Sequence, residues 1–103
     1  MRTVTKKKVS KHLAELLDEK AYITGKIVDS IFSSLREIMT GSDSEVRIEI
    51  RDFGVFEVKK TKPKNKARNP RTGETVYVPA RKKVHFKAGQ KLKEILKKPL
   101  NNG

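Results

Sequence analysis

The sequence predicts an α+β fold, in which two helices precede a small antiparallel sheet. Apolar residues recur every three to four positions through the first forty residues, then alternate with polar residues from about residue 45. Residues 59–87 contain 11 Lys and Arg and one acid, Glu74, whereas residues 1–58 contain 10 basic and 10 acidic residues. The chain is therefore expected to be a charge-balanced scaffold that carries one strongly basic extension.

Two amphipathic helices are expected over about residues 5–40, with a break at "DEKAY". The first begins at Thr5, whose hydroxyl can cap a free backbone amide. Its apolar positions are Val9, Leu13, Leu16 and Leu17, and those of the second run from Ile23 to Met39. Gly41 is typical of a helix C-terminus. Three lysines, Lys6 to Lys8, crowd the first turn, which the helix dipole disfavours. We therefore expect an external anion near this helix start.

Strands are expected over about residues 45–60, because Val46, Ile48 and Ile50 alternate with charged residues. Asp52-Phe53-Gly54 predicts a turn between two of them. The aromatic residues Phe53, Phe56 and Phe86 are predicted to form the core under the sheet. A short helix is expected over about residues 88–98, opening at Ala88-Gly89 and ending before Pro99.

Residues 59–83 form the basic extension, whose composition is also compatible with disorder. The turn at Gly73 is flanked by segments of similar length, which favours a long two-stranded arm instead. Strand alternation would place Lys60, Lys62, Lys64 and Lys66 on one face. Pro63 and Pro79 would lie one on each limb and block edge-to-edge pairing of the arm with other strands. The lysines are interpreted as phosphate contacts, although they would also keep the strand edges soluble.

Length and composition exclude several classes of protein. A chain of 103 residues is expected to form one domain, residues 1–103, with a modest core. It has no cysteine and no apolar run long enough to span a membrane, and its basic N-terminal stretch is not expected to act as a signal peptide. His12 and His85 form no cluster with other metal ligands, so both are expected to be structural or surface residues. No nucleophile–base pair or carboxylate dyad stands out, so we expect no enzyme activity, cofactor or small-molecule substrate.

One motif is more specific than the charge. The stretch Ala67-Arg68-Asn69-Pro70-Arg71-Thr72-Gly73, followed by "ARKKV" and "FKAGQKLK", resembles the bacterial HU and integration-host-factor family of DNA-bending proteins. The order of expected elements agrees with that family along nearly the whole chain. Three positions depart from the family pattern: Asp52 and Ala67 replace frequent glycines, and Asn65 replaces a common arginine.

The resemblance implies an intertwined homodimer with a helical base, a small antiparallel sheet and two long basic β-ribbon arms; a heterodimer stays open. Two chains could also bury the core that one cannot. By this resemblance, the dimer core would include four aromatic residues, Phe32, Phe53, Phe56 and Phe86. Backbone phosphates would be held by the arm limbs and the two helix starts, at Thr5, Lys6, Lys60, Lys62, Lys64, Lys66, Arg81, Lys82, Lys83, Lys87, Gly89, Gln90 and Lys91.

From the residues alone, Pro70 either shapes a turn or acts as an apolar wedge. Proline is rigid and needs no partner for an amide, and a wedge between base steps kinks a duplex. The resemblance favours the wedge, with Arg68, Asn69 and Arg71 in the minor groove. The expected function is therefore that of an architectural, histone-like protein that bends duplex DNA, compacts the bacterial nucleoid and assembles DNA complexes in the cytoplasm.

Three other functions would also use parts of this composition. An RNA-binding protein would also use basic arms, but RNA readers commonly stack bases on aromatic residues and this tip has none. A nuclease would need clustered acids for a metal pair, whereas the basic half holds only Glu74 and Glu94. Binding to a membrane surface is disfavoured, because the amphipathic helices lie in the neutral half of the chain.

Overall fold

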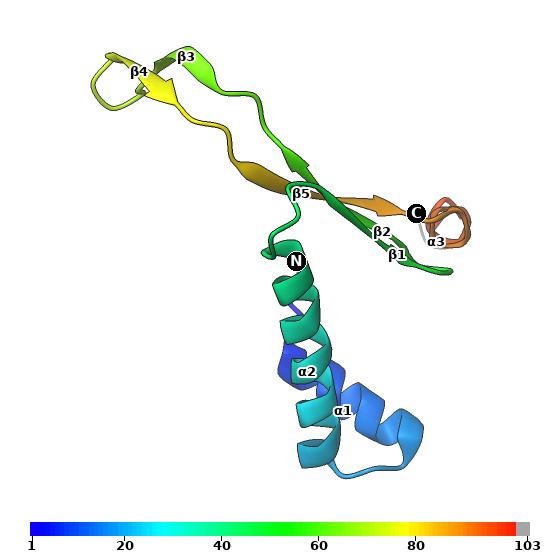
Figure 1. The fold of residues 1–103 in the computed structure, drawn as a ribbon. Helices are drawn as coiled ribbons and strands as arrows, with labels where there is room; N and C mark the ends of the chain where they lie inside the picture. The colour runs from blue at the N-terminus through cyan, green and yellow to red at the C-terminus, as the bar shows by residue number, and fades with distance from the viewer. Residues whose placement is uncertain (101–103) are drawn as a thin grey trace. The chain divides into compact units, whose positions relative to one another are not determined.

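A computed structural model describes residues 1–100, without the side chains of Asn65 and Ala67. It divides into two compact units, Met1–Gly41 and Ser42–Gly103, both drawn in Figure 1. The α+β class is confirmed: two helices form the first unit, and a small antiparallel sheet, a two-stranded ribbon and one short helix form the second. The end of the expected domain, residues 101–103, lies outside the described residues. One domain over the whole chain stays a prediction.

The first unit consists of α1 (Lys6–Leu17) and α2 (Ala21–Met39). Thr5 caps α1 as predicted: its hydroxyl accepts a hydrogen bond from the Lys8 amide at 3.4 Å. At the end of α2, Thr40 donates its amide and its hydroxyl to the Arg36 carbonyl, at 2.9 and 2.8 Å. Gly41 follows directly but does not adopt the positive φ that favours glycine at a helix end. Thr40 therefore closes the helix where glycine was expected to do so.

Small polar residues bring α1 and α2 together. Thr24 is fully buried, and its hydroxyl donates to the Ser10 carbonyl oxygen at 2.8 Å. The hydroxyl of Ser10 in turn donates to the Lys6 carbonyl oxygen at 2.9 Å. Both buried hydroxyls are thus satisfied. Within the described part of the chain, only Val28 of the apolar residues on these helices is buried, whereas most of their large apolar side chains stay exposed: Leu16, Leu17, Ile27, Ile31, Phe32 and Ile38.

The second unit is built on a three-stranded antiparallel sheet in the order β1-β2-β5, with β1 at Val46–Ile50, β2 at Gly54–Lys60 and β5 at Lys82–Ala88. The predicted turn lies between β1 and β2, where the Phe53 amide donates to the Ile50 carbonyl at 3.1 Å. Asp52 adopts a φ of 65° there. This left-handed conformation explains why a glycine is frequent at this position.

The register of the sheet aligns its apolar residues in three cross-strand rows. These rows are Val46–Val58–Val84, Ile48–Phe56–Phe86 and Ile50–Gly54–Ala88. The ring of Phe86 lies 4.8 Å from that of Phe56 and 5.4 Å from that of Phe53, measured between centroids. The predicted aromatic cluster is therefore present. Phe53 and Phe86 nevertheless remain 46% and 38% exposed in the single chain.

The ribbon of β3 (Lys64–Arg68) and β4 (Thr75–Val78) extends from β2 and β5 (Figure 1). Its pairing is not continuous with the sheet, because residues 61–63 and 79–81, which include Pro63 and Pro79, lie outside the strands. A register shift also separates Lys64 from Ala67. That four arm lysines share one face therefore stays a prediction, although two prolines and a bulge interrupt the strand alternation on which it was based.

The short helix α3 (Gln90–Leu96) follows β5 directly. Gly89 is its N-cap residue, and the Gly89 amide donates to the carbonyl oxygen of Phe53 at 2.9 Å. This bond ties the start of α3 to the β1–β2 turn. A Cβ atom at Gly89 would lie 3.2 Å from the same oxygen. The close approach accounts for a glycine at this position.

Candidate nucleic-acid interface

The tip of the ribbon is a closed turn between β3 and β4. The Asn69 amide donates to the Glu74 carbonyl at 2.8 Å, and the Gly73 amide donates to the Asn69 carbonyl at 2.7 Å. Gly73 has a φ of 76°, a conformation that glycine adopts without strain. Arg68, Pro70 and Arg71 are all exposed. The turn therefore presents an apolar, rigid ring between two cationic side chains.

Asn69 behaves differently from its neighbours in the turn. It is half-buried, and its side-chain oxygen accepts a hydrogen bond from the Arg71 amide at 2.9 Å. An asparagine amide offers one acceptor oxygen and two N–H donors. With the oxygen turned toward the backbone, the side chain is left mainly with donors. It was expected to donate or accept at base edges, and the oxygen already has a partner within the turn.

The limbs of the ribbon carry the predicted phosphate ligands. Lys62, Lys64 and Lys66 are exposed on one limb, and Arg81 and Lys82 on the other. The backbone holds the junction with the sheet: the Thr61 amide donates to the Arg81 carbonyl at 2.7 Å, and the Arg81 amide donates to the Thr61 hydroxyl at 3.0 Å. The cationic side chains are therefore carried on a backbone that is paired at its base.

Two lysine pairs lie directly across from one another where the sheet meets the ribbon. Lys59 is opposite Lys83, and Lys60 is opposite Lys82. Like charges in directly opposed positions of an antiparallel pair destabilise it. This arrangement concentrates positive charge at a cost to folding, and a bound polyanion would relieve that cost.

Glu57 partly offsets this charge on one face of the sheet. Its carboxylate lies 2.7 Å from the Lys87 ammonium and 3.7 Å from the Lys59 ammonium. The hydrogen bond from Lys87, helped by the charges of Lys59, Lys87 and Arg47, lowers the pKa of Glu57 although partial burial opposes the shift. Sequence reasoning missed Glu57. A signal was present, because Glu57 and Lys59 are two residues apart in a strand and so share a face.

The start of α3 was expected to bind phosphate through Gly89, Gln90 and Lys91. The Gly89 amide is already bonded to Phe53, so it is not free for an anion. The side chain of Gln90 donates to Glu94 at 3.0 Å, while Lys91 is exposed. Lys87, at the end of β5, is held by Glu57. Lys91 was also predicted to bind phosphate. Its ammonium takes part in none of the ion pairs found among the described residues.

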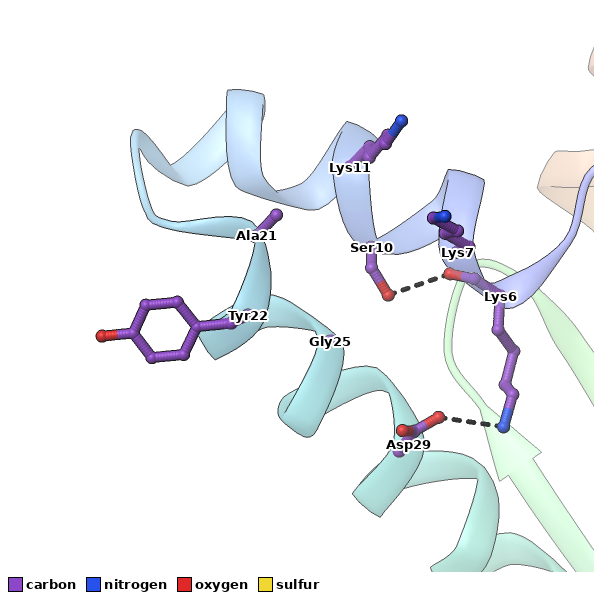
Figure 2. Close-up of a pocket in the computed structure, with 8 residues that line it drawn as sticks. All are labelled: Lys6, Lys7, Ser10, Lys11, Ala21, Tyr22, Gly25 and Asp29. Carbon is purple, nitrogen blue, oxygen red and sulfur yellow. Dashed lines mark hydrogen bonds and ion pairs between the residues drawn. The ribbon is translucent and has the colours of Figure 1, made fainter.

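The start of α1 contains Thr5 and Lys6, which belong to the other unit. A pocket of about 480 Å³ lies between α1 and α2. Figure 2 shows Lys6 at this pocket, pointing toward Asp29. The Lys6 ammonium lies 2.9 Å from the Asp29 carboxylate. The first turn was expected to need an external anion, but α2 supplies an internal one. No local pattern predicted this pair, because its members lie 23 positions apart in the chain.

The structure describes no group of three or more His, Cys, Asp or Glu residues in positions 1–100 that could hold a metal ion. None of the helices in that range is long and apolar enough to cross a bilayer. The expected dimer-core residue Phe32 lies on α2, with 48% of its surface exposed. Phe56 is half-buried in the other unit, beside Phe53 and Phe86.

The fold combines an amphipathic helical pair, a small antiparallel sheet and a basic ribbon with a proline at its tip. These features define the class of nucleic-acid-binding proteins that carry a two-stranded arm. A family model described as "Bacterial DNA-binding protein" matches residues 4–97. The chain is 39% identical to integration host factor subunit alpha of Bordetella pertussis, over 95% of this chain and 83% of that protein. It is 45% identical to integration host factor subunit beta of Actinobacillus succinogenes, over 80% of this chain and 88% of that protein.

A solved structure, a cocrystal of Anabaena HU with DNA, has a similar fold. Its TM-score is 0.79 at 23% identity, covering 93% of this chain and all of that one. The chain therefore belongs to the bacterial DNA-binding protein family of HU and integration host factor, as the tip motif indicated. It is an architectural DNA-binding protein and not an enzyme.

Proposed function

We propose that this chain acts as a homodimer that binds duplex DNA and bends it sharply by inserting Pro70 between base steps. Arg68 and Arg71 would enter the minor groove, and the arm lysines would hold the phosphates. The exposed proline at a closed, basic turn is the observation that carries this proposal. The exposed ring of Pro70 is rigid and apolar and lies between two cations in the chain, and it suits a duplex in which the wedge unstacks one base step.

The charge distribution supports a duplex partner that is read mainly by shape. The ribbon offers cations along both limbs, which suits contact with phosphates at any sequence. The minor groove distinguishes mainly A·T from G·C pairs, and flexible base steps kink at a lower cost than stiff ones. Selectivity would thus come from DNA deformability. In the cell, such bending would contribute to nucleoid compaction and to the assembly of DNA complexes in the cytoplasm.

The dimer is proposed because α1 and α2 expose an apolar face in the single chain. A second copy would cover this face and the partly exposed aromatic cluster of Phe53 and Phe86. The relatives include both an alpha and a beta subunit of integration host factor. A self-associating chain is the proposal here, and a requirement for a second, different subunit is the alternative outcome of a sedimentation experiment on the pure protein.

The substitution Pro70→Ala tests the wedge. It retains every charge, and alanine is too small to hold a base step open, so the variant should bend DNA less. Unstacking one step costs about a few kcal/mol, so affinity should fall mainly on continuous duplexes and less on nicked DNA. End-to-end fluorescence transfer on a labelled duplex measures the bend. Pro79→Ala is the matched control, because it removes a proline from the arm base and should bend like the parent.

Two results would count against the proposal. If Pro70→Ala bends the duplex as fully as the parent, Pro70 is a turn residue and the wedge is wrong. If the parent binds RNA as tightly as duplex DNA at the same salt concentration, the choice of a DNA duplex as partner is wrong. The nicked duplex separates these outcomes from a folding defect, because a folded variant still binds it.

A further inference from the structure

We propose that Asn69 is a positioning residue for DNA bending: its side-chain oxygen fixes the turn that holds Pro70, and its effect on bending passes through Pro70. The proposal rests on the proposed wedge function of Pro70. It assigns Asn69 a structural role within the turn, whereas the family resemblance implied only that Asn69 contacts the minor groove.

Three hydrogen bonds converge on Asn69. Its amide donates to the Glu74 carbonyl at 2.8 Å, its carbonyl accepts from Gly73 at 2.7 Å, and its side-chain oxygen accepts from Arg71 at 2.9 Å. The first two bonds close the loop across β3 and β4. The third spans Pro70, since it joins the residue before the proline to the residue after it. This is the turn in which an asparagine side chain mimics a backbone carbonyl.

Proline makes this side-chain bond necessary. Pro70 has no backbone N–H, so it cannot anchor itself in the turn by a donor of its own. Its orientation therefore depends on the residues on either side. Asn69 is half-buried, whereas Arg68, Pro70 and Arg71 are exposed. The side chain that faces into the turn is thus the one that restrains it, and the exposed three are available to DNA.

A restrained tip favours insertion for a thermodynamic reason. The end of a two-stranded ribbon is mobile unless it is tied down, and a mobile wedge must lose its conformational freedom when it enters the base stack. A wedge already held in one orientation loses less. Weakening the turn should therefore reduce the population of the bent complex even though Arg68, Pro70 and Arg71 all remain.

A double-mutant cycle tests whether Asn69 acts through Pro70. The affinity for a labelled continuous duplex and the bending of that duplex are measured for the parent, Asn69→Ala, Pro70→Ala and the double variant. Losing one hydrogen bond of about 1 kcal/mol corresponds to roughly a fivefold loss of binding to the continuous duplex. If Asn69 acts through the proline, the double variant should be no worse than Pro70→Ala. Losses that multiply would show an independent contact with DNA and overturn the proposal.

A rescue variant separates the acceptor oxygen from the donor N–H groups. In Asn69→Ser the hydroxyl can still accept from a backbone amide two residues on, although more weakly. Ser should therefore bend DNA better than Ala. Hydrogen exchange at the Arg71 amide, measured without DNA, should be fastest in Asn69→Ala and intermediate in Asn69→Ser. If serine and alanine behave alike in bending, the oxygen is not the operative group and the proposal fails.

The failures of the two proposals are distinguishable. If Pro70→Ala bends DNA fully, the wedge itself is wrong, and the positioning role falls with it. If Pro70→Ala bends poorly while Asn69→Ala bends like the parent, the wedge stands and only the role of Asn69 is overturned.

Discussion

The ammonium of Lys87 lies 2.7 Å from the carboxylate of Glu57, on the neighbouring strand of the sheet. The other carboxylate oxygen of Glu57 lies 3.7 Å from Lys59, and only 13% of the Glu57 side chain is exposed. One acid thus faces two cations at the base of the arm, on the face that also carries Lys83. Glu57 is an internal counterion in a region where lysines oppose one another across the strands.

The first prediction concerns acid stability. The pKa of Glu57 is lowered in the folded protein below its ordinary value of 4.5. The carboxylate therefore contributes stability above that value, and the contribution is lost as the pH falls through the lower, folded pKa. In Glu57→Gln the loss of stability between about pH 5 and pH 3 should be smaller than in the parent. The measurement is the urea midpoint of unfolding against pH.

A matched control lies in the same sheet. Glu49→Gln makes the same chemical change at a side chain that is 69% exposed and pairs with Arg47 at 3.2 Å. Its urea midpoint should depend on pH nearly as the parent's does, since exposed pairs contribute little. Equal acid profiles for Glu57→Gln and the parent would mean that the Lys87 pair does not stabilise the fold.

Local patterns in the sequence were sufficient to predict the helices and strands of the scaffold. Thr5 as a helix cap, the turn at Asp52 and the alternation of apolar residues along β1 follow from the 3.6- and 2-residue periods and from turn chemistry. These features depend on neighbours within a few residues along the chain. The proline at the ribbon tip was likewise identified from the motif around it.

The counterions and the broken ribbon were not predicted, for a different reason. Glu57 meets Lys87, and Lys6 meets Asp29, only after distant segments have paired. The ribbon loses strand pairing at residues 61–63 and 79–81, which contain Pro63 and Pro79. Proline was expected to protect the edges, but its missing N–H also removes a ladder bond where the two limbs meet.

The second prediction concerns Gly54, at the start of β2. A Cβ atom there would lie 2.5 Å from the Lys87 carbonyl oxygen and 2.7 Å from the Phe86 ring. The backbone of β5 would have to move away, so Gly54→Ala should lower the free energy of unfolding by about 2–3 kcal/mol. Chemical denaturation at fixed protein concentration measures the change.

Gly25→Ala provides the opposite case in α2. A Cβ atom at Gly25 would meet nothing within 4 Å. Alanine has the higher helix propensity, so this variant should gain about 1 kcal/mol. A Gly54→Ala variant as stable as the parent would mean that β2 and β5 are farther apart than described.

The third prediction concerns self-association through the helical unit. Phe32 and Tyr22 are both aromatic residues of α2, and they are 48% and 64% exposed in the single chain. Phe32 belongs to the predicted dimer core and Tyr22 does not. Phe32→Ala should therefore lower the free energy of unfolding of the dimer by about 3 kcal/mol or more, whereas Tyr22→Ala should change it little.

Concentration dependence supplies the measurement. The unfolding midpoint of the parent should rise with protein concentration, because a dimer is stabilised by mass action. A monomer in sedimentation, with a midpoint that does not depend on concentration, would contradict the dimer. Equal losses in Phe32→Ala and Tyr22→Ala would instead place the interface outside the predicted core.

The last prediction concerns the salt dependence of DNA binding. Each chain carries a net charge of +13, most of it in residues 59–87. If a dimer neutralises about ten phosphates, the plot of log affinity against log salt concentration should have a slope near −9, and each lost contact should reduce its magnitude by about 1 per site. Lys66 is exposed on the ribbon and was predicted to bind phosphate. Lys66→Gln, present in both chains of the dimer, should therefore reduce the magnitude of this slope by about 2.

Lys59→Gln is the matched control for this slope. Lys59 lies near Glu57, and it was not among the predicted phosphate contacts. Removing its charge should leave the slope close to that of the parent, while both variants keep the wedge and the tip turn. The slopes come from fluorescence anisotropy titrations of one duplex at several salt concentrations. A parent slope shallower than about −3 would contradict phosphate binding by the arms. Equal changes in the two variants would mean that affinity follows overall charge rather than contacts made by the ribbon.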